Sequence, residues 1–345
     1  MGVGAFLGCL PLYGAHLLLV IAVGRVLGLN RMRMYIAANI SNPFFAPVLI
    51  LAEIQVGALV QRREIHDLAL EAIRTTDPWI YGIDLVIGSV VVGTLIGLAM
   101  AGLTWASVAS GPPLAPHLAR LFDAAAYRFL EIGVTAWEFA RAKLRRDPIY
   151  GAALAVLPQS GTTLVDVGCG QGLALAVLFE AVATVTRGEW PAEQPLPPCF
   201  SRLIGIETRA RVAAIARRAL GDGADIIHDA APGGLPARMT AALVFDVLHL
   251  MPVRDQERLV VELRARLEPG GMVLVRDVDA AAGAGFHAVR IGNRLKNLAV
   301  GRFRQTLHFR TADEWTTLFT RAGWTVERSP MGYGTPFANV LFKLT

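Results

Sequence analysis

Hydrophobic and polar residues are distributed very differently in the two parts of this chain. Residues 1–109 hold three long apolar stretches with few charges, whereas after about residue 150 short apolar runs alternate with amphipathic stretches and turns. The stretch from Tyr81 to Ala109 contains a single charged residue, Asp84. Because about 20 apolar residues in a helix cross the hydrocarbon core of a bilayer, this stretch predicts a transmembrane helix.

The two earlier apolar stretches are interrupted by helix-breaking residues. The first, roughly residues 4–29, contains Pro11, and the second, roughly residues 35–60, contains Pro43 and Pro47. A proline removes a helical hydrogen bond, and in lipid the backbone groups that it frees must find partners inside the protein. We therefore expect a packed or re-entrant hairpin here rather than two simple lipid-facing rods.

The segment that follows the apolar part predicts one amphipathic helix. Residues 117–146 contain no proline and repeat hydrophobic residues every three or four positions, and Asp147-Pro148 ends the pattern. Two roles fit this helix: it packs on the following domain, or it lies on anionic lipid at the substrate entrance. The chain is thus predicted to comprise a helical membrane domain over residues 1–110, an amphipathic helical linker over 111–153 and a further domain over 154–345.

The C-terminal part alternates strand patterns with helix patterns. Apolar strands are predicted to end near Asp166, Glu207, Asp229 and Asp246, and a fifth strand follows the turn at residues 269–271. Strands separated by helices are typical of a parallel sheet with helices on both faces, so the predicted fold class is α/β with a doubly wound sheet. A capped helix beginning after Thr311 and a final antiparallel strand complete the domain.

Composition and charge support the membrane interpretation. The mean hydropathy is +0.46 and 18% of the 345 residues are charged, which is unusually apolar for a soluble enzyme. The net charge is +5, and a basic cluster between Arg141 and Arg146 follows the apolar stretches, which favours an anionic membrane surface over nucleic acid as a partner. The three cysteines lie far apart, so we expect no structural metal and a reducing cytoplasmic setting.

A glycine-rich turn is the strongest chemical signal in the chain. An apolar strand that ends at Asp166 is followed by Gly168, Cys169, Gly170 and Gly172, and then by an apolar helix. The dinucleotide-binding fingerprint has a longer last spacing and gives no reason for an acid two positions before the first glycine. The segment resembles motif I of class I S-adenosylmethionine-dependent methyltransferases.

That resemblance implies a seven-stranded Rossmann-like methyltransferase sheet and S-adenosylmethionine as the cofactor. The resemblance implies that Asp166 interacts with the amino-acid end of the cofactor. It also implies that the methionine and ribose portions lie against the turn, which includes Cys169. The turn of sequence Leu-x-Pro-Gly-Gly that begins at Leu267 is also typical of this family.

A second carboxylate supports the same cofactor. A ribose-binding acid is expected about 20 residues after the last glycine, at the end of the second strand. Glu207 follows Gly172 by 35 residues, of which 16 form a proline-rich inserted loop at 187–202, so the corrected spacing fits. Asp229, after the third strand, fits a contact to the adenine amino group, and Asp246, after the fourth, is a further candidate cofactor-binding residue.

The N-terminal part also resembles a known family. The run Gly-Ala-Phe-Leu-Gly-Cys-Leu-Pro-Leu-Tyr-Gly at residues 4–14, followed by Ser-Asn-Pro-Phe-Phe-Ala-Pro at 41–47, is similar to the bacterial membrane domain of unknown function number 2062. The resemblance brings no known chemistry. The family pattern begins further upstream, so we expect Met1 to be an internal or truncated start.

Two histidines are candidate catalytic bases. His249 stands three residues after Asp246, where this fold places the methyl acceptor, although it could equally pack beneath the pocket. His287 belongs to a basic stretch at residues 286–297, which either binds an anionic group of the acceptor or is a solvated helix face. Tyr333 and Phe337 are candidates to line the acceptor pocket, and core packing explains Phe337 equally well.

These features predict a membrane-tethered methyltransferase. Its acceptor is expected to be a small hydrophobic or lipid-like molecule methylated at oxygen, with the catalytic domain on the cytoplasmic side of the inner membrane. The alternative is a membrane protein whose Rossmann-like domain binds S-adenosylmethionine as a sensor without catalysis. Nucleic acid is not an expected substrate, because no Asn-Pro-Pro-Tyr-type motif follows the fourth strand.

Overall fold

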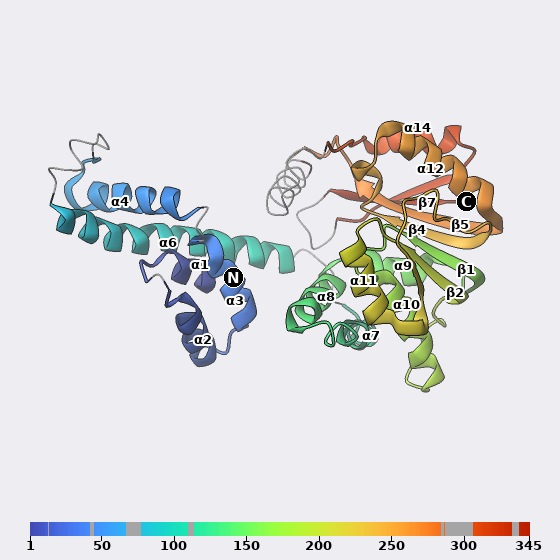
Figure 1. Cartoon of the computed structure of the whole chain (residues 1–345), viewed down its shortest axis with the longest axis horizontal. Helices are drawn as coiled ribbons and strands as arrows, with labels where there is room; N and C mark the ends of the chain where they lie inside the picture. Colours follow the sequence, from blue (N-terminus) through green and yellow to red (C-terminus); the bar gives the residue numbers. More distant parts are fainter. Residues whose placement is uncertain are drawn as a thin grey trace. The chain divides into compact units, whose positions relative to one another are not determined.

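The computed structural model describes most of the chain (Figure 1). The described residues are 1–12, 14–41, 45–66, 77–109, 114–283, 286, 306–332 and 338–345, without the side chains of 106–109. The chain divides into two compact units, Met1–Ala109 and Ser110–Thr345, which we describe separately.

The described part of the first unit is helical. Its elements are α1 (Gly2–Cys9), α2 (His16–Val26), α3 (Arg31–Ala38), the short helix η1 (Asn39–Ser41), α4 (Ala46–Arg62) and α6 (Pro78–Ala109). Each of the two interrupted apolar stretches is divided into two short helices, α1 with α2 and α3 with α4. By length and composition, the segment Pro78–Trp105 of α6 could cross a membrane, and an 18-residue window within it has a mean hydropathy of 2.2.

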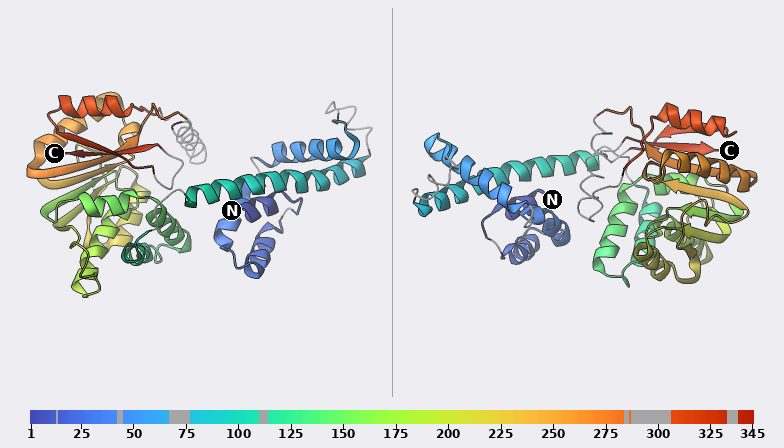
Figure 2. Two further views of the ribbon diagram at one scale, coloured as in Figure 1. Left: turned by 180° about the vertical axis from the view of Figure 1, so that it is seen from behind. Right: turned by 45° about the horizontal axis from the view of Figure 1, so that its top comes forward.

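Helices α4 and α6 lie side by side at very short range (Figure 2). A Cβ atom added to Gly57 of α4 would lie 1.9 Å from the carbonyl oxygen of Asp84 on α6. A Cβ atom added to Gly88 of α6 would lie 1.7 Å from the carbonyl oxygen of Glu53 on α4. The two helices therefore touch through their backbones, which small residues permit in helix pairs within membranes.

The second unit is built on a seven-stranded sheet with the order β3-β2-β1-β4-β5-β7-β6. Its strands are β1 (Ser160–Val167), β2 (Cys199–Ile206), β3 (Asp225–Ile227), β4 (Met239–Phe245), β5 (Leu267–Val278), β6 (Val326–Pro330) and β7 (Asn339–Leu344). Strands β1 to β5 pair in parallel, whereas β7 is antiparallel to both β5 and β6. The predicted doubly wound, seven-stranded Rossmann-like sheet is confirmed.

Helices cover both faces of this sheet. They are α7 (Pro116–Tyr127), α8 (Val134–Arg146), α9 (Ile149–Val156), α10 (Leu173–Thr186), α11 (Ala210–Leu220), α12 (Val253–Arg266) and α14 (Ala312–Arg321), with the short helices η2 (Gly221–Gly223) and η3 (Leu248–Leu250). Side chains alternate between the faces: Leu164 packs in the cluster that holds Leu175 of α10, and Val165 in the cluster that holds Leu259 of α12. Thr311 begins α14 with the predicted cap, a complete capping box with Glu314.

Two predicted boundaries were wrong. The single helix expected over 117–146 is two helices, because the chain turns between α7 and α8 at Gly133, whose φ of 141° suits glycine alone. The turn lets Phe129 become fully buried in the core shared with α10. The proline-rich loop is also shorter than expected, since β2 begins at Cys199 rather than after Arg202.

The contact between α4 and α6 leads to a stability prediction. Gly88→Ala is expected to destabilise the protein by about 1–3 kcal/mol, because its methyl group would overlap the α4 backbone and force the helices apart. Gly102→Ala, on the same helix with no atom within 4 Å of the added Cβ, is the matched control and should be neutral or slightly stabilising. Thermal unfolding of the full chain in detergent measures both; equal melting temperatures would contradict the described packing.

Candidate functional site

The candidate site lies at the carboxyl edge of the parallel strands. Asp166 in β1 stands in register with Gly205 of β2 and Leu243 of β4, so the residues that follow these three strands emerge at one edge. Strand order reverses at β1, where its two neighbours connect to helices on opposite faces, and this is where open α/β sheets bind ligands. The structure thus brings together the regions in which the cofactor-binding residues were predicted.

The glycine-rich turn is shaped by three residues with positive φ. Gly168, Gly170 and Gly172 have φ angles of 70°, 58° and 83°. Added Cβ atoms would lie 2.4 Å from Val247 at Gly168 and 2.7 Å from Leu220 at Gly172, whereas none would meet an atom within 4 Å at Gly170. The outer two glycines therefore serve the turn and its packing, and Gly170 is the position at which the turn faces open space.

Asp166 is a buried carboxylate with no local partner. Its exposed fraction is 4%, and no hydrogen-bond donor in the described part of the chain reaches its side chain. Burial, followed by the negative charge of Glu207, raises the pKa of Asp166 to about 7. A buried carboxylate of this kind is stabilised by a cationic group brought to it, such as the ammonium of an amino acid.

Glu207 is also buried, but Arg209 binds it. The Arg209 Nε and Nη2 atoms donate to the two carboxylate oxygens at 2.8 and 2.9 Å, and the Arg209 backbone N–H donates at 2.9 Å. Burial alone would raise the pKa of Glu207, but these hydrogen bonds outweigh it and lower the pKa, with a further contribution from the Gly170 backbone N–H. Glu207 is therefore an ionised acceptor that reaches the glycine-rich turn.

Three other predicted cofactor-binding residues differ in their surroundings. Asp229 is exposed after β3, and one of its oxygens accepts a hydrogen bond from the Ala230 N–H at 2.7 Å. Cys169 is half-buried in the turn, and burial raises the pKa of its thiol far above the usual range. Asp246 adopts a φ of 59°, and its carboxylate is ion-paired with Arg276.

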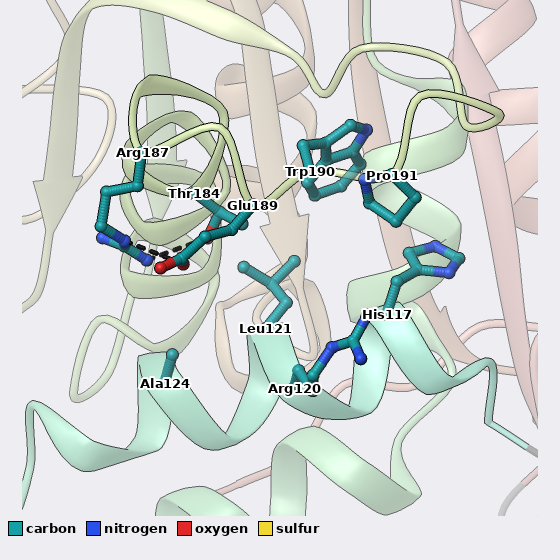
Figure 3. A pocket seen from close by; sticks show the side chains of 9 residues that line it. All are labelled: His117, Arg120, Leu121, Ala124, Thr184, Arg187, Glu189, Trp190 and Pro191. Carbon is teal, nitrogen blue, oxygen red and sulfur yellow. Dashed lines mark hydrogen bonds and ion pairs between the residues drawn. The ribbon is translucent and has the colours of Figure 1, made fainter.

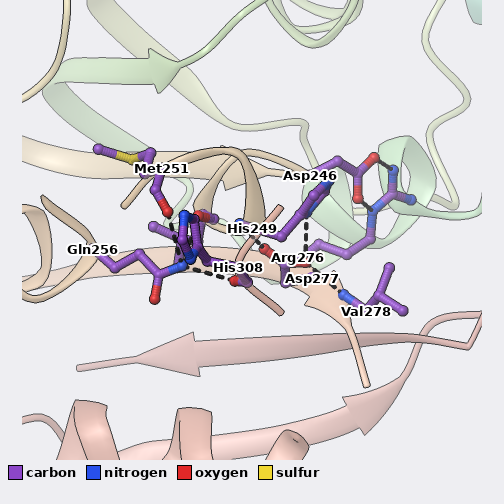
Figure 4. Close-up of polar contacts among 9 residues, drawn as sticks. Asp246, His249, Met251, Gln256, Arg276, Asp277, Val278 and His308 are labelled. Carbon is purple, nitrogen blue, oxygen red and sulfur yellow. Dashed lines mark hydrogen bonds and ion pairs between the residues drawn. The ribbon is translucent and has the colours of Figure 1, made fainter. Parts of the chain in front are cut away.

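Arg276 is a residue of this site that sequence reasoning missed. It is 2% exposed in β5 and binds Asp246 (Figure 4). It also binds Asp147, which directly follows α8. Burial raises the pKa of Asp246, but the guanidinium charge and its hydrogen bonds outweigh this and lower it. An arginine within an apolar strand was the available signal, because a buried arginine requires acidic partners.

His249 forms a buried pair with Asp277, a residue of β5 that the sequence analysis did not identify as a candidate. The His249 Nδ1 atom lies 2.8 Å from an Asp277 oxygen, and the His249 backbone N–H donates to the other oxygen at 3.1 Å (Figure 4). The ring stacks on Phe309 with centroids 5.0 Å apart. Asp277 thereby favours the tautomer with the proton on Nδ1.

Gln256 of α12 holds the segment that carries His249. It is fully buried, and its Nε2 donates at 2.9 Å to the carbonyl oxygens of both Leu248 and His308. The His308 N–H in turn donates to the His249 carbonyl at 2.8 Å. The second predicted base, His287, lies outside the described residues, as do most of the basic stretch at 286–297 and the candidates Tyr333 and Phe337.

A separate cavity of about 400 Å³ lies between α7 and the segment after α10 (Figure 3). The rings of His117 and Trp190 meet there in a T-shaped arrangement, with centroids 5.9 Å apart, and Arg187 is paired with Glu189. None of the predicted cofactor-binding residues lines this cavity. The cavity lies near the C-terminal end of α10, whereas the glycine-rich turn directly precedes the N-terminal end of this helix.

Comparison with known proteins gives two family matches and a group of similar folds. Residues 136–329 match the family described as "Methyltransferase domain", and residues 1–109 match "Uncharacterized protein conserved in bacteria (DUF2062)". The comparison with curated proteins found no match.

Several solved structures are similar to the chain. One, from Thermotoga maritima, is described as a SAM-dependent methyltransferase, possible histamine N-methyltransferase; it is 20% identical over 66% of this chain and 98% of its own, with a TM-score of 0.41. Another, from Mesorhizobium loti, is an S-adenosylmethionine-dependent methyltransferase, 19% identical over 56% of this chain and 95% of its own, with a TM-score of 0.40. The family matches agree with the observed fold and show to which family the chain belongs. The chain belongs to the S-adenosylmethionine-dependent methyltransferases with a class I, Rossmann-like fold, and carries at its N-terminus a domain of the bacterial family DUF2062.

Proposed function

We propose that this protein is a membrane-tethered methyltransferase that methylates a hydroxyl oxygen of a small hydrophobic or lipid-like acceptor. The buried pair of His249 and Asp277 at the carboxyl edge of the sheet carries this proposal, because a hydroxyl acceptor needs a base and the pair supplies one. The alternative, a domain that only senses the cofactor, does not require a base at this place.

The cofactor-binding residues fit S-adenosylmethionine. Asp166, buried without a hydrogen-bond donor, would bind the ammonium of the methionine portion, while the open space at Gly170 admits the ligand. Glu207 would accept hydrogen bonds from the ribose hydroxyls through the lone pairs that Arg209 leaves free, and Asp229 would contact the adenine amino group. The cofactor supplies a methyl group that is already activated on a sulfonium, so these residues only bind and orient.

His249 is proposed to act as the general base. The acceptor's hydroxyl would lose its proton to Nε2 of His249, and S-adenosylmethionine, held by Asp166 and Glu207, would supply the methyl group that the oxygen takes up. Asp277 holds the ring in the required tautomer and stabilises the positive charge that the ring gains. Correct orientation of the acceptor supplies much of the remaining acceleration.

The first unit is proposed to be the membrane anchor. Large apolar side chains of α6 are exposed in that unit, including Leu95, Leu98 and Leu103, which are 63–69% exposed, and lipid would cover them. The positive-inside rule places the cluster Arg25 to Arg33 in the cytoplasm. Arg62 would then fall on the opposite side, where it is ion-paired with Asp84.

Cofactor affinity is expected to depend on pH through Asp166. The ammonium of the cofactor binds the ionised carboxylate. Because the pKa of Asp166 is about 7, its ionised fraction falls as the pH decreases. The affinity should therefore be about eightfold lower at about pH 6 than at about pH 7.5. Calorimetry with S-adenosylmethionine measures this. Asp166→Asn should weaken binding and remove the dependence, whereas Asp225→Asn, an exposed acid at the start of β3, should change neither. An unaltered pH profile in Asp166→Asn would refute the assigned role.

Loss of the proposed base should slow transfer without weakening cofactor binding. His249→Gln is expected to lower the transfer rate by about 10²–10⁴-fold, and Asp277→Asn also, since either change removes the oriented base. The measurement is transfer of labelled methyl from S-adenosylmethionine into an organic-extractable product of bacterial membrane extract. His117→Gln, in the separate cavity, is the matched control. Full activity in His249→Gln would rule out the proposed base.

If α6 anchors the protein in a membrane, its behaviour in cell fractionation can be predicted. The full chain should sediment with membranes, resist extraction by high salt and alkaline carbonate, and dissolve in detergent, because α6 is held by apolar contact with lipid. Replacing Val90 and Leu98 of α6 by Arg is expected to weaken membrane association, since charges in the hydrocarbon core are costly. The same changes at the exposed Val253 and Val261 of α12 are the control. Release of the unaltered protein by salt alone would exclude an inserted anchor.

A further inference from the structure

Glu53 is a buried acid that neither the fold nor methyl transfer explains. It lies in α4 of the first unit with an exposed fraction of 0%, and both of its carboxylate oxygens are buried without a hydrogen-bond partner. An unpaired ionised carboxylate in such surroundings loses its hydration without compensation, which is among the most costly arrangements a protein can hold. Ionisable residues retained inside membrane segments usually serve a function.

The close contact between α4 and α6 keeps Glu53 in place. Its carbonyl oxygen is the atom that a Cβ on Gly88 would meet at 1.7 Å, so Glu53 lies where the two helix backbones touch. Gly88 stands ten residues inside α6 from Pro78, which corresponds to about 15 Å along the helix. With the first unit inserted in a membrane as proposed above, a glutamate side chain is too short to reach water over that distance.

The second acid of the same contact, Asp84, is compensated. It is likewise 0% exposed, but Arg62 and His66 form ion pairs with its carboxylate, and Gln61 donates a hydrogen bond at 2.6 Å. The helices α1, α4 and α6 contain no acidic residue other than Glu53 and Asp84. Of the two acids at this contact, Asp84 has partners for its negative charge. Glu53, if ionised, would have none among the described residues.

The other titratable groups near this contact do not balance Glu53. Cys9 of α1 is close enough for the charge of Glu53 to act on its thiol, and a thiol carries no positive charge. The buried Tyr81 hydroxyl of α6 has no hydrogen-bond partner, and its ring lies 4.7 Å from that of His66. Among the described basic side chains near this contact, Arg62 and His66 are both engaged with Asp84.

We propose that Glu53 is a proton-binding site in the membrane unit, protonated at neutral pH and held at the contact of α4 with α6. A metal ion would require about six oxygen ligands, whereas this contact offers one unengaged carboxyl group, which suffices for a proton. The neutral acid leaves a buried hydroxyl and a buried carbonyl oxygen unpaired, which costs far less than an unpaired charge. Release of the proton would place that charge between the helices, so α4 and α6 must separate or admit water when it leaves.

Infrared difference spectroscopy of the full chain tests this site directly. The protein is dissolved at neutral pH in a detergent without ester groups, and the spectrum of Glu53→Gln is subtracted from that of the unaltered protein. The difference is expected to contain the C=O stretch of one protonated carboxyl group. The matched variant Asp84→Asn should instead remove carboxylate stretches, because Asp84 is ion-paired. Asp166 contributes equally to both spectra and cancels.

Two results would overturn the proposal. One is loss of carboxylate stretches in Glu53→Gln, which would mean that the group is ionised. The other is a carboxylate band of Glu53 that responds when choline is replaced by sodium, potassium or magnesium, which would mean that a metal cation is the ligand. Glu53→Gln preserves the shape of the neutral acid, and unchanged binding of S-adenosylmethionine by calorimetry verifies that this variant is folded in the second unit.

Discussion

Parallel pairing of β1 with β2 and β4 is the constraint on which the methyltransferase site depends. Because these strands run in the same direction and in register, Asp166, Glu207 and the segment that carries His249 emerge at one edge of the sheet although they are distant in sequence. Helices on opposite faces keep that edge free for a ligand. In the glycine-rich turn after β1, Gly168 packs against Val247 and Gly172 against Leu220. Gly170 between them faces open space.

Buried charge is handled in two ways across the molecule. The buried acids Glu207 and Asp277 and the partly exposed Asp246 have local partners in Arg209, His249 and Arg276, which fix the orientation of their side chains. Asp166 and Glu53 are buried without a donor, and both are proposed to take their partner from outside the chain, an ammonium group in one case and a proton in the other. An unpaired buried acid is unfavourable, so its retention is best explained by a ligand.

Local patterns in the sequence were sufficient for the fold class and for the candidate acids, because strand ends, glycine turns and helix caps depend on neighbouring residues. Asp147 and Arg276 are 129 positions apart, and their pairing follows only from the packing of α8 and α9 against the sheet edge. The dependence of His249 on Asp277 was missed for the same reason. The turn at Gly133 was missed because the hydrophobic period continues through it, whereas burial of Phe129 requires the chain to bend.

The identity of the methyl acceptor is the claim that links the two units. The most direct measurement supplies methyl-labelled S-adenosylmethionine to the full chain in the presence of bacterial membranes and follows the label into organic-extractable, protein and nucleic-acid fractions. The account predicts label in the organic-extractable fraction, bound as a methyl ether or ester. Label confined to protein or nucleic acid would contradict it.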